Sequence, residues 1–162
     1  MRTSNNRAKI AVAGSREKYF INPSIGYKGT VKILQRYRGN IMFGCGDSPL
    51  GGVDAWVKNY CLSNNIPIFL FPPKSFSREA FIRRNRDMVL WCDKLICIFA
   101  EGIRVKSGTF STLMFALKMN KPIEVYIINS RERKIIQVIP KLMLRKGRLW
   151  IKGWSIVEEV EI

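Results

Sequence analysis

Short apolar runs, each long enough for one β-strand, alternate along the chain with segments of helical periodicity. The runs lie near residues 10–13, 40–44, 66–71, 94–100 and 123–128, and the helical segments cover 23–38, 53–64, 77–91 and 107–119. Nearly continuous apolar strands are buried on both faces, and their alternation with amphipathic helices is typical of a parallel sheet. The sequence therefore predicts an α/β fold with a parallel sheet of about five strands and helices on both faces.

The alternation of strand and helix patterns stops after residue 129. Four short β-like pieces follow, separated by Pro140, by Lys146-Gly147 and by Lys152-Gly153. They predict a short C-terminal β-hairpin extension that adds an edge to the sheet or forms a dimer contact. We expect residues 1–129 to form the main domain and residues 130–162 to pack on that same domain.

Composition limits the chemistry. The chain has no histidine, which excludes Ser-His-Asp and Cys-His mechanisms and histidine-ligated metals. Its four cysteines form no C-x-x-C pair, so we expect reduced core thiols. We expect no metal and no cofactor. The N-terminal stretch 1–7 does not have the pattern of a signal peptide, and no apolar run is long enough to cross a bilayer. We therefore expect a cytoplasmic protein without a membrane partner.

Three of the predicted strands end in glycine-rich polar segments. Gly14-Ser15-Arg16 follows the first strand, residues 44–54 follow the second, and Glu101-Gly102 and Ser107-Gly108-Thr109 follow the fourth. Ligands of open parallel sheets bind beyond the carboxyl ends of the strands. Glycine lets the backbone approach a ligand closely, and free N–H groups at a helix start attract phosphate. These segments predict an anion-binding crevice.

Neither a Walker A loop nor a dinucleotide G-x-G-x-x-G fingerprint follows the first strand. The basic cluster at residues 83–86 has two interpretations. It is either a solvated helix face or, on a helix that covers the crevice, a fork of arginine donors suited to phosphate.

The order and spacing of these motifs resemble the SLOG superfamily. Its Rossmann-like domains include the LOG cytokinin-activating phosphoribohydrolases and the DNA-processing protein DprA, and the chain looks closest to small stand-alone bacterial or phage members. The matching pieces span about residues 9–128: I-A-V-A-G-S-R at 10–16, G-G-V-D at 51–54, I-R-R-N-R-D-M at 82–88, D-K-L-I-C-I-F at 93–99, S-G-T at 107–109 with Thr112, and Ala116 with N-K-P-I at 120–123. The extension lies outside the resemblance.

The resemblance implies a crevice for a nucleotide or a nucleotide-derived ligand. It would be lined by Gly14, Ser15, Arg16, Gly51, Gly52, Asn85, Gly102, Ser107, Gly108 and Thr109, and the neighbouring loops and helix add Gly46, Asp47, Asp54 and Arg84 as candidates. The chain departs from the LOG motif P-G-G-x-G-T-x-x-E. Residues 99–102 read F-A-E-G, a longer basic loop follows, and Thr112 takes the glutamate position.

Three functions remain open from the sequence. The first is a sensor or sequestering module that binds a nucleotide derivative without turnover. The second is a nucleoside-monophosphate phosphoribohydrolase or N-glycosidase, which needs a carboxylate and has Asp54, Glu101 and Asp47 as candidates at strand ends; Asp54 could instead serve the helix dipole. The third is DprA-like nucleic-acid binding through a basic surface. The net charge of +16 is suited to it, although the same charge could serve solubility alone. Trp150 and Trp154 either add stacking on bases or form the core of the extension. Self-association as a homodimer or larger homo-oligomer is a further expectation.

Overall fold

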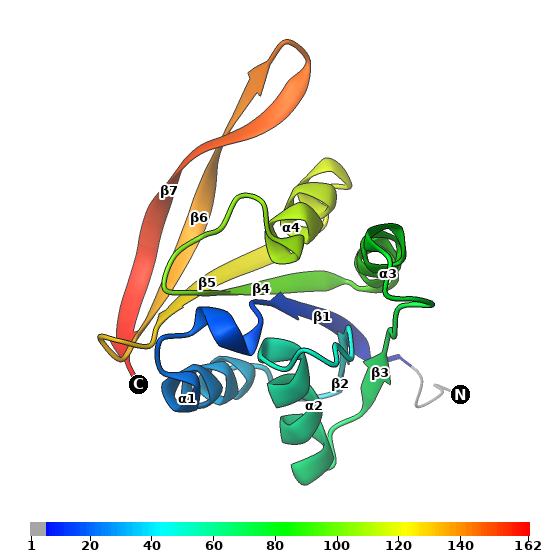
Figure 1. The fold of residues 1–162 in the computed structure, drawn as a ribbon, viewed down its shortest axis with the longest axis vertical. Coiled ribbons are helices and arrows are strands. Elements are labelled where there is room, and N and C mark those ends of the chain that lie inside the picture. Colours follow the sequence, from blue (N-terminus) through cyan, green and yellow to red (C-terminus); the bar gives the residue numbers. More distant parts are fainter. Residues whose placement is uncertain (1–5) are drawn as a thin grey trace.

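A computed structural model describes residues 6–162 as one seven-stranded sheet with helices on both faces (Figure 1). Residues 1–5, which hold most of the stretch assessed above for a signal peptide, lie outside the described part. The strands run in the order β3-β2-β1-β4-β5-β6-β7. Their bounds are β1 Ala8–Gly14, β2 Ile41–Cys45, β3 Ile68–Leu70, β4 Lys94–Ala100, β5 Ile123–Asn129, β6 Lys134–Arg145 and β7 Arg148–Glu161.

The first five strands are parallel, as the sequence predicts, and β6 and β7 are antiparallel additions at one edge. Four α-helices and one short 3-10 helix connect the strands. They are η1 Glu17–Tyr19, α1 Pro23–Leu34, α2 Val53–Ser63, α3 Arg78–Trp91 and α4 Gly108–Lys118.

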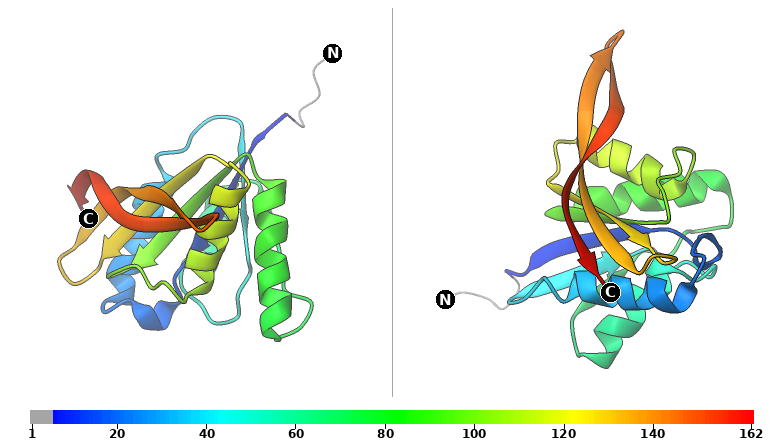
Figure 2. Two further views of the ribbon diagram at one scale, coloured as in Figure 1. Left: turned by 90° about the horizontal axis from the view of Figure 1, so that it is seen from above. Right: turned by 90° about the vertical axis from the view of Figure 1, so that its left-hand side faces the viewer.

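Two apolar cores lie on opposite faces of the sheet. On one face α1 and α2 bury Ile33 and Trp56 against the strands; on the other, α3 and α4 bury Met88 and Leu113. The end-on and side views of Figure 2 show the same two layers of helix around the sheet. The four cysteines are buried and unpaired, as expected for core thiols.

The helix starts are set by side chains that cap the first turn. Asn22, Ser77 and Ser107 precede α1, α3 and α4, and each side chain accepts a hydrogen bond from a backbone N–H three residues on. Such caps satisfy amides that have no partner within the helix. By contrast, α2 begins after Gly52 with no side-chain cap.

The strand order creates a switch point between β1 and β4. From β1 the chain moves outward through β2 to β3, whereas from β4 it moves outward through β5, in the opposite direction. Connections therefore diverge at the carboxyl ends of β1 and β4 and leave room between them. Ligands of open α/β sheets bind at such points.

The C-terminal extension is a long, twisted two-stranded ribbon rather than a short hairpin of separate pieces (Figures 1 and 2). The breaks expected at Pro140 and Lys152-Gly153 do not interrupt the strands, because β6 and β7 stay paired from Lys134 to the turn at Lys146-Gly147. Register shifts, between Gln137 and Val138 and between Lys141 and Leu142, take up the irregularity instead. Bulges of this kind tolerate glycine and proline within a strand. Among the described residues, no helix is long and apolar enough to cross a membrane.

Candidate functional site

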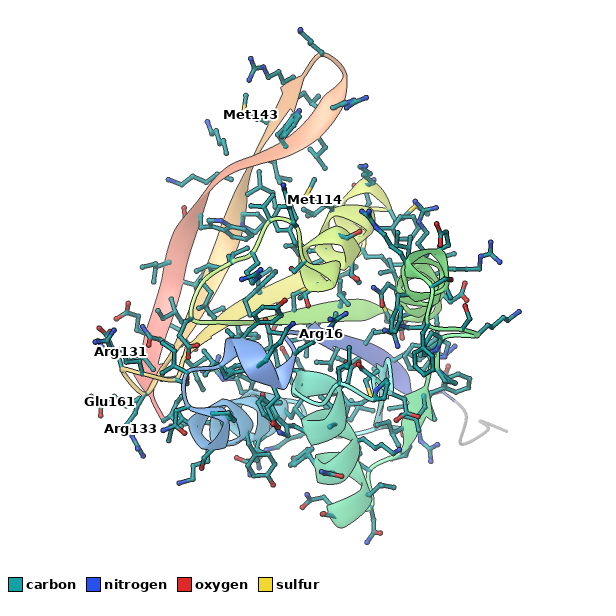
Figure 3. The ribbon with its side chains drawn as sticks, in the orientation of Figure 1. Arg16, Met114, Arg131, Arg133, Met143 and Glu161 are labelled. Carbon is teal, nitrogen blue, oxygen red and sulfur yellow. The ribbon has the colours of Figure 1, made fainter. Side chains whose placement is uncertain are left out.

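A cavity of about 260 Å³ lies at the switch point, beyond the carboxyl ends of β1 and β4. It is lined by the end of β1, by η1, by the loops before α2 and α4, and by the facing sides of α3 and α4. Figure 3 labels Arg16, which lies in the body of the molecule beside η1. The lining residues are Ala13, Gly14, Ser15, Arg16, Tyr19, Gly46, Ser48, Gly51, Asp54, Phe81, Arg84, Asn85, Met88, Arg104, Lys106, Ser107, Gly108, Thr109 and Thr112.

Gly14 forms one wall because it lets α2 start directly against the end of β1. A Cβ atom at residue 14 would lie 2.5 Å from both Cγ atoms of Val53, the first residue of α2. Ser15 fastens the contact: its carbonyl accepts from the Val53 N–H at 3.2 Å, and its Oγ accepts from the Ala100 N–H at 3.0 Å. This packing brings the start of α2 to the cavity.

Two glycines with positive φ shape the loop before α2. Gly51 has φ 73° and Gly52 has φ 81°, a region that L side chains rarely adopt. At Gly52 a Cβ atom would lie 2.5 Å from the Glu17 backbone nitrogen. Gly52 therefore serves the packing of backbone on backbone beneath the cavity, while Gly51 lines it.

Arg84 of α3 is the most constrained cation of the cavity, with 8% of its surface exposed. Its Nη1 donates to the carbonyl oxygens of Gly46 and, at 3.1 Å, Phe71, and its Nε donates to Asn85 Oδ1 at 2.8 Å. The guanidinium also lies over the Phe81 ring, 5.2 Å from its centroid. Both backbone carbonyls belong to loops that follow strands, so Arg84 holds those loops against α3 while it keeps a positive charge beside the cavity.

A second arginine is placed by an aromatic ring at the other side. The Arg104 guanidinium lies over the Tyr19 ring at 4.2 Å from the centroid, a cation–π arrangement that restricts its mobility. With Lys106, from the same loop, and Arg16, the described lining has four cationic side chains.

Asp54, in the first turn of α2, is the single carboxylate among the described lining residues. Burial raises the pKa of this carboxyl to about 6, although the positive charge of Arg84 and the backbone amides of Ser48 and Gly46 act in the opposite direction. The same burial lowers the pKa of Arg84, and the charge of Asp54 opposes that shift. Asp54 is thus a carboxyl with a pKa close to neutral pH, and it lies beside the positive charge of Arg84.

The start of α4 presents backbone donors. Ser107 Oγ accepts from the Phe110 N–H at 3.1 Å, and helix geometry leaves the amides of Gly108 and Thr109 without a partner within the helix. Asn85 faces this turn: its Nδ2 lies 3.7 Å from the place where a Gly108 Cβ would be. Because Asn85 Oδ1 already accepts from Arg84, the amide group of Asn85 turns its N–H donors toward α4.

The structure brings together most of the residues expected from the sequence. Gly14, Ser15, Arg16, Gly46, Gly51, Asp54, Arg84, Asn85, Ser107, Gly108 and Thr109 all line the cavity. Four expected residues are absent from the described lining: Asp47, Gly52, Glu101 and Gly102. Asp47 instead forms an ion pair with Lys58, at 3.0 Å.

The carboxylate of Glu101 holds neighbouring loops together. Its carboxylate accepts hydrogen bonds from the Ile21 N–H at 2.9 Å, from the Ser130 N–H at 2.7 Å, and from the Ser130 hydroxyl. It thereby ties the end of β4 to the loop before α1 and to the loop after β5. Those three donors occupy the oxygens that catalysis would need.

Sequence reasoning missed several lining residues: Ala13, Tyr19, Ser48, Phe81, Met88, Arg104, Lys106 and Thr112 as a wall residue. Of these, Arg104 and Lys106 carried a visible signal, because both stand in the basic loop before S-G-T. Thr112 is buried, and its hydroxyl donates to the Gly108 carbonyl at 2.8 Å, so it braces the first turn of α4.

A second hollow of about 430 Å³ lies on the other side of Arg84, between the loop after β3 and the first turns of α3. Leu70, Phe71, Pro72, Ser77 and Arg83 line it, and Arg84 contributes to the walls of both hollows. In the part of the chain from residue 6 onward, no three Cys, Asp or Glu side chains are grouped as ligands of a metal ion.

Comparison with known proteins gives a match in fold and none in sequence. No protein-family model and no curated protein matches the chain. Among solved structures, the crystal structure of the structural-genomics target TM1055 is similar, with a TM-score of 0.51 and 14% sequence identity, and the match covers 72% of each chain. At this identity the likeness concerns the fold alone, and it agrees with a Rossmann-like α/β architecture.

Proposed function

We propose that the chain binds a nucleotide or a nucleotide-derived phosphate ligand in the cavity between β1 and β4, as a sensor or sequestering module. The observation that carries the proposal is the charge of the lining: Arg16, Arg84, Arg104 and Lys106 face one carboxylate, Asp54. Arginine is suited to phosphate because its planar fork can donate two parallel hydrogen bonds. A cavity with this excess of positive charge attracts anions.

The donors are already in place before a ligand arrives. Arg84 is held by two carbonyls and Asn85, Arg104 lies over Tyr19, and the α4 amides point outward from a capped turn. A site whose donors are held in position loses less side-chain entropy on binding. The phosphate would lie at the start of α4, where amides and the helix dipole favour negative charge.

We also infer that the chain is a SLOG-type protein. The motifs that carry the resemblance fall on β1, on the starts of α2 and α4, and on α3, and eleven of the expected residues line one cavity at the switch point. The fold of TM1055 supports the architecture and leaves the family to be tested.

Hydrolysis is a second candidate function, and one observation favours it. Asp54 lies in the cavity beside Arg84 with a pKa raised to about 6, and a perturbed carboxyl in a cleft is typical of catalytic sites. Against turnover, Glu101 is occupied by three donors and Thr112 stands where the LOG enzymes carry their glutamate. Asp54 would have to act alone on the glycosidic bond.

Calorimetry against AMP, cyclic AMP and ADP-ribose tests the binding proposal, with mass spectrometry of co-purified small molecules as a guide to the ligand. Arg104→Ala should weaken the best binder by roughly tenfold to a hundredfold, since a hydrogen bond to a charged group contributes about 1.5–3 kcal/mol. Arg78→Ala removes an exposed arginine outside the cavity and is the matched control. Equal affinities of the two variants, or no heat with any anion, would contradict the proposal.

Chromatography of the same mixtures for free adenine tests the second candidate. Base release that disappears in Asp54→Asn, with binding retained, would establish hydrolysis. Intact ligand after long incubation supports a binding module.

A further inference from the structure

The projecting end of the β6–β7 ribbon carries a concentrated positive charge. Residues 133–157 contain seven lysines and arginines and no acid, and five of the seven lie between residues 141 and 152. We call residues 141–152 the arm. It includes the turn and extends beyond the last pairing of β6 with β5, which ends at Val138. The arm lies outside the segment that carries the SLOG resemblance.

The pairing register sorts the side chains of the arm onto two faces. Residues directly opposite each other in an antiparallel pair share a face, and neighbours along a strand alternate. Arg145 pairs with Arg148 and Met143 with Trp150, so these four share one face. Leu142 pairs with Ile151 and Leu144 with Leu149, so the other face is entirely aliphatic. Lys141 and Lys152 flank the register shift at the base of the arm.

At its base the aliphatic face continues into the side of the ribbon that packs on the body, whereas Leu142 and Leu144 farther out are 44% and 74% exposed. Ile151 and Trp154 contact the core cluster beneath α3 and α4, which also contains Val138. Trp154 is therefore a packing residue. Trp150 is on the opposite face with 49% of its surface exposed, beside two arginines.

The positive charge of the arm indicates which kind of partner it can bind. The chain as a whole has a net charge of +16, so a second copy would meet the arm with like charge. A polyanion is complementary to it. An indole ring set among cations is suited to an unstacked base, which single strands offer and intact duplexes do not.

We propose that the arm binds single-stranded nucleic acid, with its lysines and arginines against phosphates and Trp150 stacked on a base. This surface is separate from the cavity. β6 runs antiparallel to β5, so the arm extends past the amino-terminal ends of the parallel strands, whereas the cavity lies at their carboxyl ends. Figure 3 shows Met143 on the projecting ribbon and Arg16 in the body.

Fluorescence anisotropy with a labelled 20-nucleotide oligo(dT) tests the proposal on the full chain. Five phosphate contacts predict a slope of about −3.5 for log affinity against log salt, at roughly 0.7 per contact for single strands. The triple variant Arg145→Gln, Lys146→Gln, Arg148→Gln should reduce the magnitude of that slope by about 2. The control variant Lys28→Gln, Arg38→Gln, Arg78→Gln removes the same charges from exposed positions elsewhere and should leave it nearly unchanged.

Trp150 provides a second readout. Trp150→Ala should weaken binding by roughly tenfold and Trp150→Phe by much less, because a phenyl ring still stacks. Circular dichroism confirms that each variant is folded. Equal losses in the two triple variants would show that only net charge matters, and would overturn the proposal. Tighter binding to a 20-base-pair duplex, or arm-dependent binding to phosphatidylserine vesicles without binding to oligo(dT), would overturn it as well.

Discussion

The contact between Gly14 and Val53 allows a test of how α2 is brought to the cavity. In Gly14→Ala the new Cβ would lie 2.5 Å from each Cγ of Val53, and still closer to its Cβ. Favourable carbon–carbon contacts lie near 3.5–4.0 Å, so α2 would have to retreat by roughly 1 Å or more. That movement would stretch the hydrogen bond from the Val53 N–H to the Ser15 carbonyl.

The cost follows from these two effects. Overpacking costs about 1–3 kcal/mol and the loss of one backbone hydrogen bond about 1 kcal/mol, so Gly14→Ala should lower the free energy of unfolding by roughly 2–4 kcal/mol. Val53→Ala cannot relieve the clash, because its Cβ remains. Val53→Gly removes every clashing atom, so in that background Gly14→Ala should cost less than about 1 kcal/mol.

Urea denaturation followed by circular dichroism measures all four members of each double-mutant cycle. We expect a coupling energy of roughly 1.5–3 kcal/mol with Val53→Gly and a value near zero with Val53→Ala. An equal cost of Gly14→Ala in the wild-type and Val53→Gly backgrounds would contradict a steric origin of the lost stability. Ligand affinity should fall in Gly14→Ala and return in the Gly14→Ala, Val53→Gly double variant.

Three shorter predictions concern the polar groups near the cavity. Glu101→Gln should lower the free energy of unfolding by about 1–3 kcal/mol, because an amide cannot accept all the hydrogen bonds from Ile21 and Ser130. Loss of ligand binding without loss of stability would contradict this structural role. The pKa of Asp54 is raised from 3.8 to about 6, so its contribution to stability is full below pH 4 and is lost as the pH rises through 6. Asp54→Asn should therefore flatten a plot of the free energy of unfolding against pH between pH 4 and 6, and an unchanged plot would refute the shift. Arg84→Met should raise the pKa of Asp54 further, because it removes the positive charge that opposes the effect of burial on this pKa. NMR titration of the carboxyl measures the change, and a lower pKa in this variant would exclude that cause.

The parallel part of the fold could be predicted because its strands are apolar on both faces. Five strands and four helices are predicted close to where they occur, and the predicted helix starts at residues 77 and 107 coincide with the capping serines Ser77 and Ser107. The apolar run at 66–71 predicts a longer strand than β3, which is only Ile68–Leu70. Its position at the sheet edge, with Phe69 half exposed, explains why the apolar run is longer than the strand.

The ribbon was harder to predict, because Pro140 and Gly153 ordinarily end strands. Pro140 pairs with Trp154, and the neighbouring register shift lets both strands continue. In a two-stranded ribbon that projects from the body, local pairing decides where strands end. Residue type alone does not carry that information.

At the site, the glycine-rich strand ends located the cavity because backbone geometry leaves a signature in the sequence. No sequence signature marks Tyr19, Phe81 and Ser48, because the path of the loops and the angle of α3 bring them to the cavity. Glu101 illustrates the opposite error. It stands at a strand end, yet its carboxylate turns to Ser130, a residue 29 positions away that no local pattern connects with it.

Arg84 stands as a partition between the two hollows, and this sets a length limit on whatever occupies the first. A ligand that extended toward the loop after β3 would have to displace a guanidinium anchored to the carbonyls of Gly46 and Phe71. Compact molecules meet no such barrier. Discrimination between a mononucleotide and a longer conjugate would then reside in one side chain, and shortening it would merge the two compartments into a single elongated trough.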